Sequence, residues 1–291
     1  MRTRALSSVG VVAVGLIPAL LGGPFIVALL VVLCGAAYHE YIGMAARLGT
    51  APLAPGVGYA AIAAFAVAPL VGGGPTTVIG IASAAVAAPL AFAIVRPTPD
   101  DAFVGWTLTV AGALYLGLPA YSGVALRRLD GPVDAGWLRS MADGTAVGWS
   151  GFPQGLGWFL VVLLATWIGD SAAYLVGRAI GRRPLAPRIS PNKTVEGSLG
   201  GLVGSGAVAV AGVALFGLGL HPAAGALIGV ALGVAGQLGD LAESMLKRQA
   251  GVKDSGTLIP GHGGMLDRID ALLFALVAGW LVAAAVNRAT A

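Results

Sequence analysis

Long apolar segments separated by short polar ones run along the whole chain. A membrane-spanning helix needs about 20 mostly apolar residues, because each residue adds roughly 1.5 Å towards a hydrocarbon thickness of about 30 Å. Nine segments qualify or nearly do, at 5–22, 24–39, 56–72, 76–95, 102–126, 156–178, 198–220, 222–246 and 269–287. Within 5–39, the run Gly22-Gly23-Pro24 leaves open either a hairpin between two spans or a kink in one helix. The pattern predicts an all-α polytopic integral membrane protein with about nine transmembrane helices.

Composition excludes a soluble globular protein. Of 291 residues, 57% are hydrophobic and only 10% are charged, and the mean hydropathy is +0.87. No polar stretch is long enough for a separate domain, so we expect one transmembrane domain over 1–291, with N-terminal spans in 1–150 and C-terminal spans in 156–287. The first apolar run follows two arginines like a secretory signal, but further spans follow it, which favours a retained anchor. The single Cys34 cannot form an internal disulfide and is expected to be a packing residue.

The basic residues predict the orientation of the spans. With nine spans, 13 of the 17 Lys and Arg residues fall on one side, which carries the loops 179–197 and 247–268. If 5–39 is a single helix, two arginines change sides and the split becomes 11 to 6. Cytoplasmic loops carry the excess of positive charge, so we expect a multi-pass inner-membrane protein with these two loops in the cytoplasm. Topology explains the net charge of +4 better than a nucleic-acid partner does. The polar segment 127–153 on the opposite side is interpreted as a connector or an interfacial loop.

Charged residues cluster in the last 125 positions, and in an apolar chain such a cluster indicates a functional site. On a helix, Asp240, Glu243 and Lys247 share one face, which we expect to point into the protein. An intramembrane ion pair between Lys247 and one of the two acids is the structural alternative. Asp170 lies inside another span, with Tyr174 and Arg178 following on roughly its face. It is a site candidate, unless it forms a structural pair with a basic residue such as Arg178.

A glycine-rich turn precedes the last span. Asp267 and Asp270 lie three residues apart at the start of that helix and present two carboxylates on one face, which suits Mg²⁺. Favourable interaction with the helix dipole is the alternative explanation. The preceding run Pro260-Gly261-His262-Gly263-Gly264 offers backbone N–H groups that form an anion site, although alone this signal is weak. His262 either binds phosphate or caps the loop, since no second histidine lies nearby for a histidine-based metal site.

The segment from Ser190 to Gly197 predicts a second anion site. Ser190 followed by Pro191 is typical of a helix N-cap with proline at the first helical position. The next amides would then be free to meet an anion, with Lys193 beside them. An ordinary helix start remains the alternative.

These segments together resemble the phosphatidate cytidylyltransferase (CDP-diacylglycerol synthase) family. The C-terminal signature of that family is matched without a gap by Ser244, Lys247-Arg248, Lys253-Asp254, Gly256, Pro260, His262-Gly263-Gly264 and Asp267-Arg268-Ile269-Asp270. Asp170 to Arg178 and Ser190 to Gly197 also resemble family patterns, except that Asn192 stands where many members have lysine. The similarity in specific residues covers roughly 167–270.

The resemblance implies a Mg²⁺-dependent transfer of the cytidylyl group from CTP to phosphatidate, with release of pyrophosphate. It implies that Asp240 and Asp267 hold the metal, with potassium as a further candidate cation, and that the protein is a homodimer. The catalytic candidates are Asp240, Asp267, Lys247 and Arg248. The substrate-binding candidates are Lys193, Thr194, Glu196, Ser190, Asp170, Lys253, Asp254, His262, Gly263, Gly264, Arg268 and Asp270.

Three other functions compete with this interpretation. A related CTP-using lipid enzyme, such as a polyprenol kinase, would not carry the full C-terminal signature. A cation-coupled transporter would also bury acids such as Asp170 and Asp240, but it would not need the glycine-rich turn and Lys193 at one membrane face. A structural membrane scaffold explains the apolar runs and leaves the charge clustering unexplained.

Overall fold

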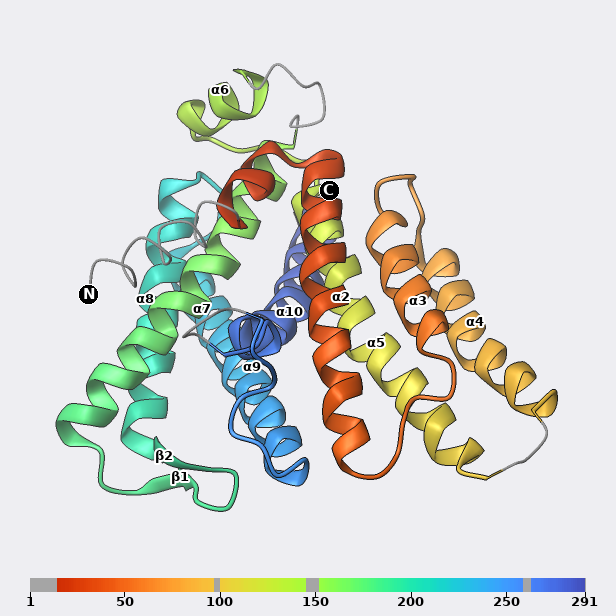
Figure 1. Ribbon diagram of the computed structural model, residues 1–291. Coiled ribbons are helices and arrows are strands. Elements are labelled where there is room, and N and C mark those ends of the chain that lie inside the picture. The colour runs from red at the N-terminus through yellow and green to blue at the C-terminus, as the bar shows by residue number, and fades with distance from the viewer. Residues whose placement is uncertain (1–14, 97–99, 145–151, 259–262, 291) are drawn as a thin grey trace.

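The computed structural model describes residues 15–96, 100–144, 152–258 and 263–290. A helical stretch at 15–21 precedes a bundle of helices and one short hairpin (Figure 1). The elements are α2 (Gly23–Arg47), α3 (Pro55–Val67), α4 (Pro75–Ile94), α5 (Ala102–Arg127), α6 (Gly136–Gly144), α7 (Pro153–Ile180), β1 (Pro184–Ala186), β2 (Ser190–Thr194), α8 (Val195–Leu215), α9 (Pro222–Gln249) and α10 (Leu266–Thr290).

The mostly helical, polytopic architecture confirms the predicted class. Among the described residues, seven helices are long and apolar enough to cross a membrane, namely α2, α4, α5, α7, α8, α9 and α10. The segment predicted at 56–72 is shorter than expected: α3 has 13 residues and ends at Val67. Pro69 comes one residue after the C-cap Ala68, a position where proline is common because it cannot continue the helix. The predicted span at 5–22 lies largely outside the described residues, so the count of nine is not confirmed.

Gly22 interrupts the helix within residues 5–39. Its φ of 68° and ψ of −156° separate the helical stretch 15–21 from α2, so the two are not one continuous helix. This left-handed φ favours glycine, which has no Cβ to clash. Arg127, at the end of α5, donates hydrogen bonds to the carbonyl oxygens of Ala19 and Leu20, at 2.9 and 3.0 Å. A side chain at Gly22 would collide with the Arg127 guanidinium, so the turn needs glycine for space as well.

Helix α10 occupies the centre of the bundle. It packs against α2, α5, α7 and α9, while α3 and α4 lie on one flank and α8 with the hairpin on the other (Figure 1). Along the α7–α8 interface small residues allow the backbones to approach closely. A Cβ added at Gly201 would lie 3.0 Å from the Ala173 Cβ, and one added at Gly169 would collide with Ser205. Such small-residue packing is how helices associate in lipid. Cys34 is buried in the core, as predicted.

The predicted helix start at Ser190 is wrong. Residues Ser190–Thr194 form β2, which pairs antiparallel with β1, and α8 begins only at Val195. Thr194 caps this helix, because its hydroxyl accepts a hydrogen bond from the backbone N–H of Gly197 at 3.1 Å. In this pairing Ser190 lies opposite Ala186 and Thr194 lies opposite Pro184, so the segment is extended. The Ser-Pro pair therefore belongs to a strand.

The polar segment 127–153 contains α6, which is attached to the α8–α9 connection. The Trp137 indole N–H donates to the carbonyl oxygen of Leu215 at 3.2 Å, and the Asp134 N–H donates to that of Gly217 at 2.9 Å. Leu138 is fully buried. The described part of the segment is therefore packed against the bundle.

Loops predicted on the same side of the membrane lie at the same end of the bundle. At one end, the Arg248 Nε donates to the carbonyl oxygen of Ile189 in the hairpin at 3.1 Å. At the other, the Asn287 amide near the end of α10 reaches the Asp130 carbonyl oxygen at 3.1 Å. Figure 1 shows α6 and the hairpin at opposite ends.

Candidate active site

A pocket of about 630 Å³ opens where α7, α9 and α10 meet the hairpin. Its walls come from three sequence segments, 170–178, 185–198 and 237–270. Ten of the residues predicted for the site line it: Asp170, Ser190, Lys193, Thr194, Asp240, Lys247, Asp254, Asp267, Arg268 and Asp270. The structure therefore brings together the three segments in which charge was predicted to concentrate.

Asp240 and Lys193 join α9 to the hairpin. The Lys193 ammonium forms an ion pair with Oδ2 of Asp240, and the two side chains are 28% and 32% exposed. The Ser244 hydroxyl lies 3.4 Å from Oδ1, one helical turn further on. The ion pair with Lys247 that the helix spacing offered as an alternative forms at Glu243 and not at Asp240. It places an acid and a base from different segments on one wall of the pocket.

Lys247 lies between two other acids. Its ammonium forms an ion pair with Glu243, one turn before it on α9, and lies 2.6 Å from Oδ1 of Asp267 on α10. The Glu243 side chain is fully buried, and neither of its oxygens has a partner in hydrogen-bonding geometry among the described residues. The lysine therefore meets Glu243 as a charge contact. The acidic face of α9 points into the protein, as predicted, and one lysine offsets two carboxylates.

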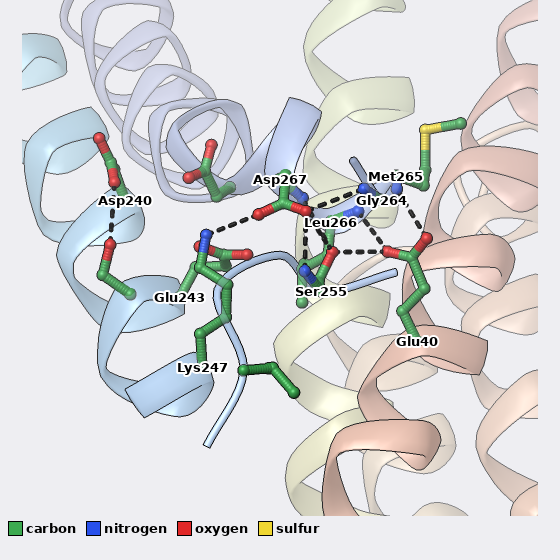
Figure 2. A network of polar contacts seen from close by, with 12 residues as sticks. Glu40, Asp240, Glu243, Lys247, Ser255, Gly264, Met265, Leu266 and Asp267 are labelled. Atoms are coloured by element: carbon green, nitrogen blue, oxygen red, sulfur yellow. Dashed lines mark hydrogen bonds and ion pairs between the residues drawn. The ribbon is translucent and has the colours of Figure 1, made fainter. Parts of the chain in front are cut away.

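Asp267 is held by backbone groups as well as by the lysine. Its Oδ2 accepts hydrogen bonds from the N–H groups of Ser255 at 2.8 Å and Gly264 at 2.9 Å, and lies 2.8 Å from the Ser255 hydroxyl. Its Oδ1 faces Lys247 (Figure 2). Asp267 lies in the first turn of α10, as predicted. Both oxygens are directed by specific donors, so the carboxylate has one defined orientation.

Glu40 of α2 belongs to the same network and was missed by the sequence analysis. Its carboxylate accepts hydrogen bonds from the Ser255 hydroxyl and from the N–H groups of Met265 and Leu266, each at 2.8 Å (Figure 2). The side chain is buried, with 7% exposure. A signal was present, since Glu40 is the only acidic residue before Asp100 in the sequence and lies in an apolar span.

Several predicted residues lie beside the pocket and do not line it. Glu196 accepts hydrogen bonds from the backbone N–H groups of Arg182 and Arg183, at 3.0 and 3.2 Å, so it fastens the hairpin to α8. Arg248 contacts the Ile189 carbonyl oxygen. Gly264 donates its N–H to Asp267. Lys253 and Gly263 belong to the part of the chain that the structure describes, but they do not line the pocket. His262 lies outside the described residues.

The pocket also contains polar residues that the sequence analysis did not assign to the site. The Gln237 side-chain NH₂ donates to the Ser198 backbone carbonyl oxygen at 2.9 Å, and the Ser198 hydroxyl donates to the Gln237 side-chain oxygen Oε1. Gln237 lies one turn before Asp240 on α9. Tyr174 and Arg178, noted only for their spacing from Asp170, also line the pocket and contact each other at 3.4 Å. Asp170 forms no ion pair with Arg178 within the described part of the chain.

The acids of the pocket can supply ligands for a divalent ion. The carboxylates of Asp170, Asp240 and Asp270 line one pocket and interact electrostatically with one another. Over residues 15–96, 100–144, 152–258 and 263–290, no group of three or more His, Cys, Asp or Glu side chains has metal-binding geometry. Mg²⁺ commonly takes one or two carboxylates and fills its shell with waters and substrate phosphates. Asp240 and Asp267 both line this pocket, and each faces a lysine, Lys193 and Lys247 respectively.

Comparison with known proteins agrees with the geometry. The cytidylyltransferase family matches residues 2–286. A phosphatidate cytidylyltransferase of Synechocystis sp. is 44% identical over 171 residues, which are 57% of this chain and 58% of that protein. One of Staphylococcus haemolyticus is 46% identical over 123 residues, 42% and 47% of the two chains. One of Mycobacterium bovis is 44% identical over 132 residues, 45% and 43% of the two chains.

The aligned regions span about half the length of these curated relatives. The family match, by contrast, extends over nearly the whole sequence and includes every segment that contributes to the pocket. The chain belongs to the cytidylyltransferase family.

Proposed function

We propose that the chain is a phosphatidate cytidylyltransferase. It transfers the cytidylyl group of CTP to phosphatidate, which forms CDP-diacylglycerol and releases pyrophosphate. The observation that carries the proposal is that Lys193 pairs with Asp240 and Lys247 with Asp267 in the same pocket. Family membership and the names of the similar proteins support it.

The proposed reaction brings two anions together. A phosphatidate oxygen forms a bond to the α-phosphorus of CTP, and the bond from that phosphorus to the bridging oxygen breaks, so pyrophosphate leaves with the electron pair. A phosphate monoester has a second pKa of about 6 and is largely ionised at neutral pH, so the nucleophile needs little help from a general base. The main task of the site is to offset charge and to align the reacting groups.

The basic residues of the pocket can perform that task. Lys193 and Lys247 are paired with Asp240 and Asp267, so both ammonium groups are already held in the pocket. Arg178 and Arg268 line the same pocket. We assign phosphate binding to these four cations, with Arg248 and Lys253 close by in sequence. Thr194 and Ser190 add hydroxyl groups on the hairpin wall.

Asp240 and Asp267 would hold Mg²⁺ in this proposal, and potassium is a second candidate cation beside it. Bound Mg²⁺ supplies Lewis-acid stabilisation of phosphate charge. Asp170 and Asp270 complete the acidic lining and orient the bound groups. Dependence of the reaction on each cation is tested by chelation and by adding the ions back one at a time.

The position of the pocket suits a lipid substrate and a soluble one. It lies at the hairpin end of the bundle, the side on which 13 of the 17 basic residues were predicted, so we place it at the cytoplasmic face of the inner membrane. Tyr174, which lines the pocket, and its neighbour Leu175 are 64% and 63% exposed. This apolar surface gives the lipid a path from the side, while CTP enters from water.

A direct assay tests the proposed reaction. Purified protein in detergent receives CTP labelled at the α-phosphate, phosphatidate and Mg²⁺, and we expect the label to move into a lipid product. Diacylglycerol without the phosphate serves as the control lipid and should accept no label. A folded preparation that labels no lipid would contradict the proposal.

The homodimer implied by the family resemblance is a separate proposal. Native mass spectrometry in detergent should give twice the mass of the chain. A monomeric mass at concentrations where the enzyme is active would contradict it.

A further inference from the structure

The first amides of α10 have no partners within their own helix, and α2 supplies an acceptor for the N–H of Leu266 and for that of Met265, which directly precedes the helix. A helix leaves its first four N–H groups without intrahelical acceptors. The N–H groups of Met265 and Leu266 donate to Oε1 and Oε2 of Glu40, and the Asp267 N–H points to the Ser255 hydroxyl at 3.3 Å. The cap of α10 is thus a carboxylate more than 220 positions away in sequence.

Ser255 connects this cap to the acid of the pocket. Its hydroxyl oxygen lies 2.8 Å from Oε2 of Glu40 and 2.8 Å from Oδ2 of Asp267 (Figure 2). A hydroxyl has one proton, so it donates to one of the two carboxylates at a time. The Ser255 backbone N–H also donates to Asp267. Any movement of Glu40 is therefore passed to the Asp267 oxygen that these donors hold.

The loop before α10 leaves space for the Glu40 carboxylate. A Cβ added at Gly256 would lie 2.5 Å from Oε1 of Glu40, and one added at Gly264 would collide with its Oε2. Real Cβ contacts essentially never fall below 3.0 Å. Two glycines of the C-terminal signature are therefore fitted to an acid from the N-terminal half of the chain.

We propose that Glu40 is a positioning residue, which holds Asp267 in its orientation towards the pocket through Ser255 and the first amides of α10. It touches neither substrate nor ion in this role. Hydrogen bonds to a carboxylate are among the stronger ones in proteins, so three of them can fix both the loop and the helix start. The consequence for catalysis rests on the proposed function, whereas the consequence for the α10 amides does not.

The test compares Glu40→Gln, Ser255→Ala and the double variant with Asp130→Asn, a matched control at an exposed acid near the opposite end of the bundle. Glu40→Gln keeps the size of the side chain and removes the charge and one acceptor. We expect kcat to fall about tenfold while the KM for CTP changes less than about threefold, because Asp267 is misoriented and the other binding groups remain. If the kcat of Glu40→Gln equals that of the control Asp130→Asn, the proposal is overturned.

The double variant distinguishes one pathway from two. If Glu40 acts through Ser255, the double variant should lose no more kcat than the more impaired single variant. If the fold-losses of kcat in the two single variants multiply in the double variant, Glu40 and Ser255 have independent roles, and the proposal would be overturned. Ser255→Ala removes one hydroxyl and should fold even if Glu40→Gln does not. Wild-type kcat in Ser255→Ala would then also overturn it.

Hydrogen exchange gives a readout without activity. In protein free of metal and substrate, Glu40→Gln should speed exchange of the Met265 and Leu266 amides at least about tenfold and leave amides within α5 unchanged. Uniformly faster exchange would indicate general destabilisation and would contradict the proposal. If the wild type makes no CDP-diacylglycerol, the proposed function fails, while the exchange data still decide whether Glu40 holds this loop.

Discussion

The N-terminal and C-terminal halves of the chain use polar residues in different ways. Helices α2 to α5 hold few charges and pack through aromatic rings against glycines, as Tyr38 does against Gly58 and Gly112. The segment from α7 to α10 supplies every residue that lines the pocket. A membrane makes charge expensive, so charged side chains concentrate where they act. The apolar half is nevertheless part of the site's construction, because Glu40 caps α10.

The sharpest contrast between the halves is expected from Asp240→Asn. This change removes the Asp240 carboxylate, which pairs with Lys193 and is also a proposed metal ligand. The rate of CDP-diacylglycerol formation should therefore fall at least about a hundredfold. Asp100→Asn, at an exposed acid of the N-terminal half, is the matched control and should keep the wild-type rate. Full activity of Asp240→Asn would remove the proposed metal site.

Lys247→Met tests how the C-terminal half tolerates its buried charge. Glu243 is fully buried, and the change leaves it without its ion-pair partner. The free energy of unfolding should fall by about 3 kcal/mol or more, measured as a lower midpoint of thermal unfolding in detergent.

The double variant Lys247→Met/Glu243→Gln separates stability from activity. It removes the uncompensated charge, so the midpoint of thermal unfolding should recover most of the decrease seen in Lys247→Met. Activity should stay low, because Asp267 and the substrate phosphates still lack the lysine. Recovery of both would mean that Lys247 serves stability alone.

Gly58→Ala tests the packing of the N-terminal half. A Cβ at Gly58 would collide with the Tyr38 ring, so the free energy of unfolding should fall by about 1–3 kcal/mol. Gly56→Ala, in the same helix, has nothing within 4 Å of the added Cβ and serves as the control. The KM for CTP should be unchanged in both variants. A raised KM in Gly58→Ala alone would show that α3 contributes to the site.

Glu196→Gln should have the smallest effect. Glu196 binds the backbone of the hairpin at the protein surface, and the amide oxygen of glutamine can accept the same N–H groups. We expect the KM for CTP to rise less than about threefold, since exposed charge contributes little. A loss of kcat comparable to that of Asp240→Asn would mean that Glu196 acts in the pocket, as the sequence had suggested.

Much of this arrangement was readable from local patterns. Apolar length located the described spanning helices, and the helical spacing of Glu243 and Lys247 predicted a shared inward face. Asp267 was placed correctly in the first turn of α10. These predictions succeeded because each depends on residues within a few turns of one another.

The failures share a different physical origin. Ser190 looked like a helix cap, but β1 pairs with it, and that pairing depends on residues outside the local motif. Glu40 carries no motif of its own, and its partners lie 215 or more positions away in sequence. Contacts between distant segments, which local periodicity does not encode, decided these points.

A structure of the protein with CTP and Mg²⁺ bound tests the central claim most directly. We expect the triphosphate to lie in the pocket between Lys193 and Lys247, with density for the ion at Asp240 and Asp267. A triphosphate bound elsewhere on the molecule, or an ion that contacts neither aspartate, would contradict the assignment of this pocket as the site of cytidylyl transfer.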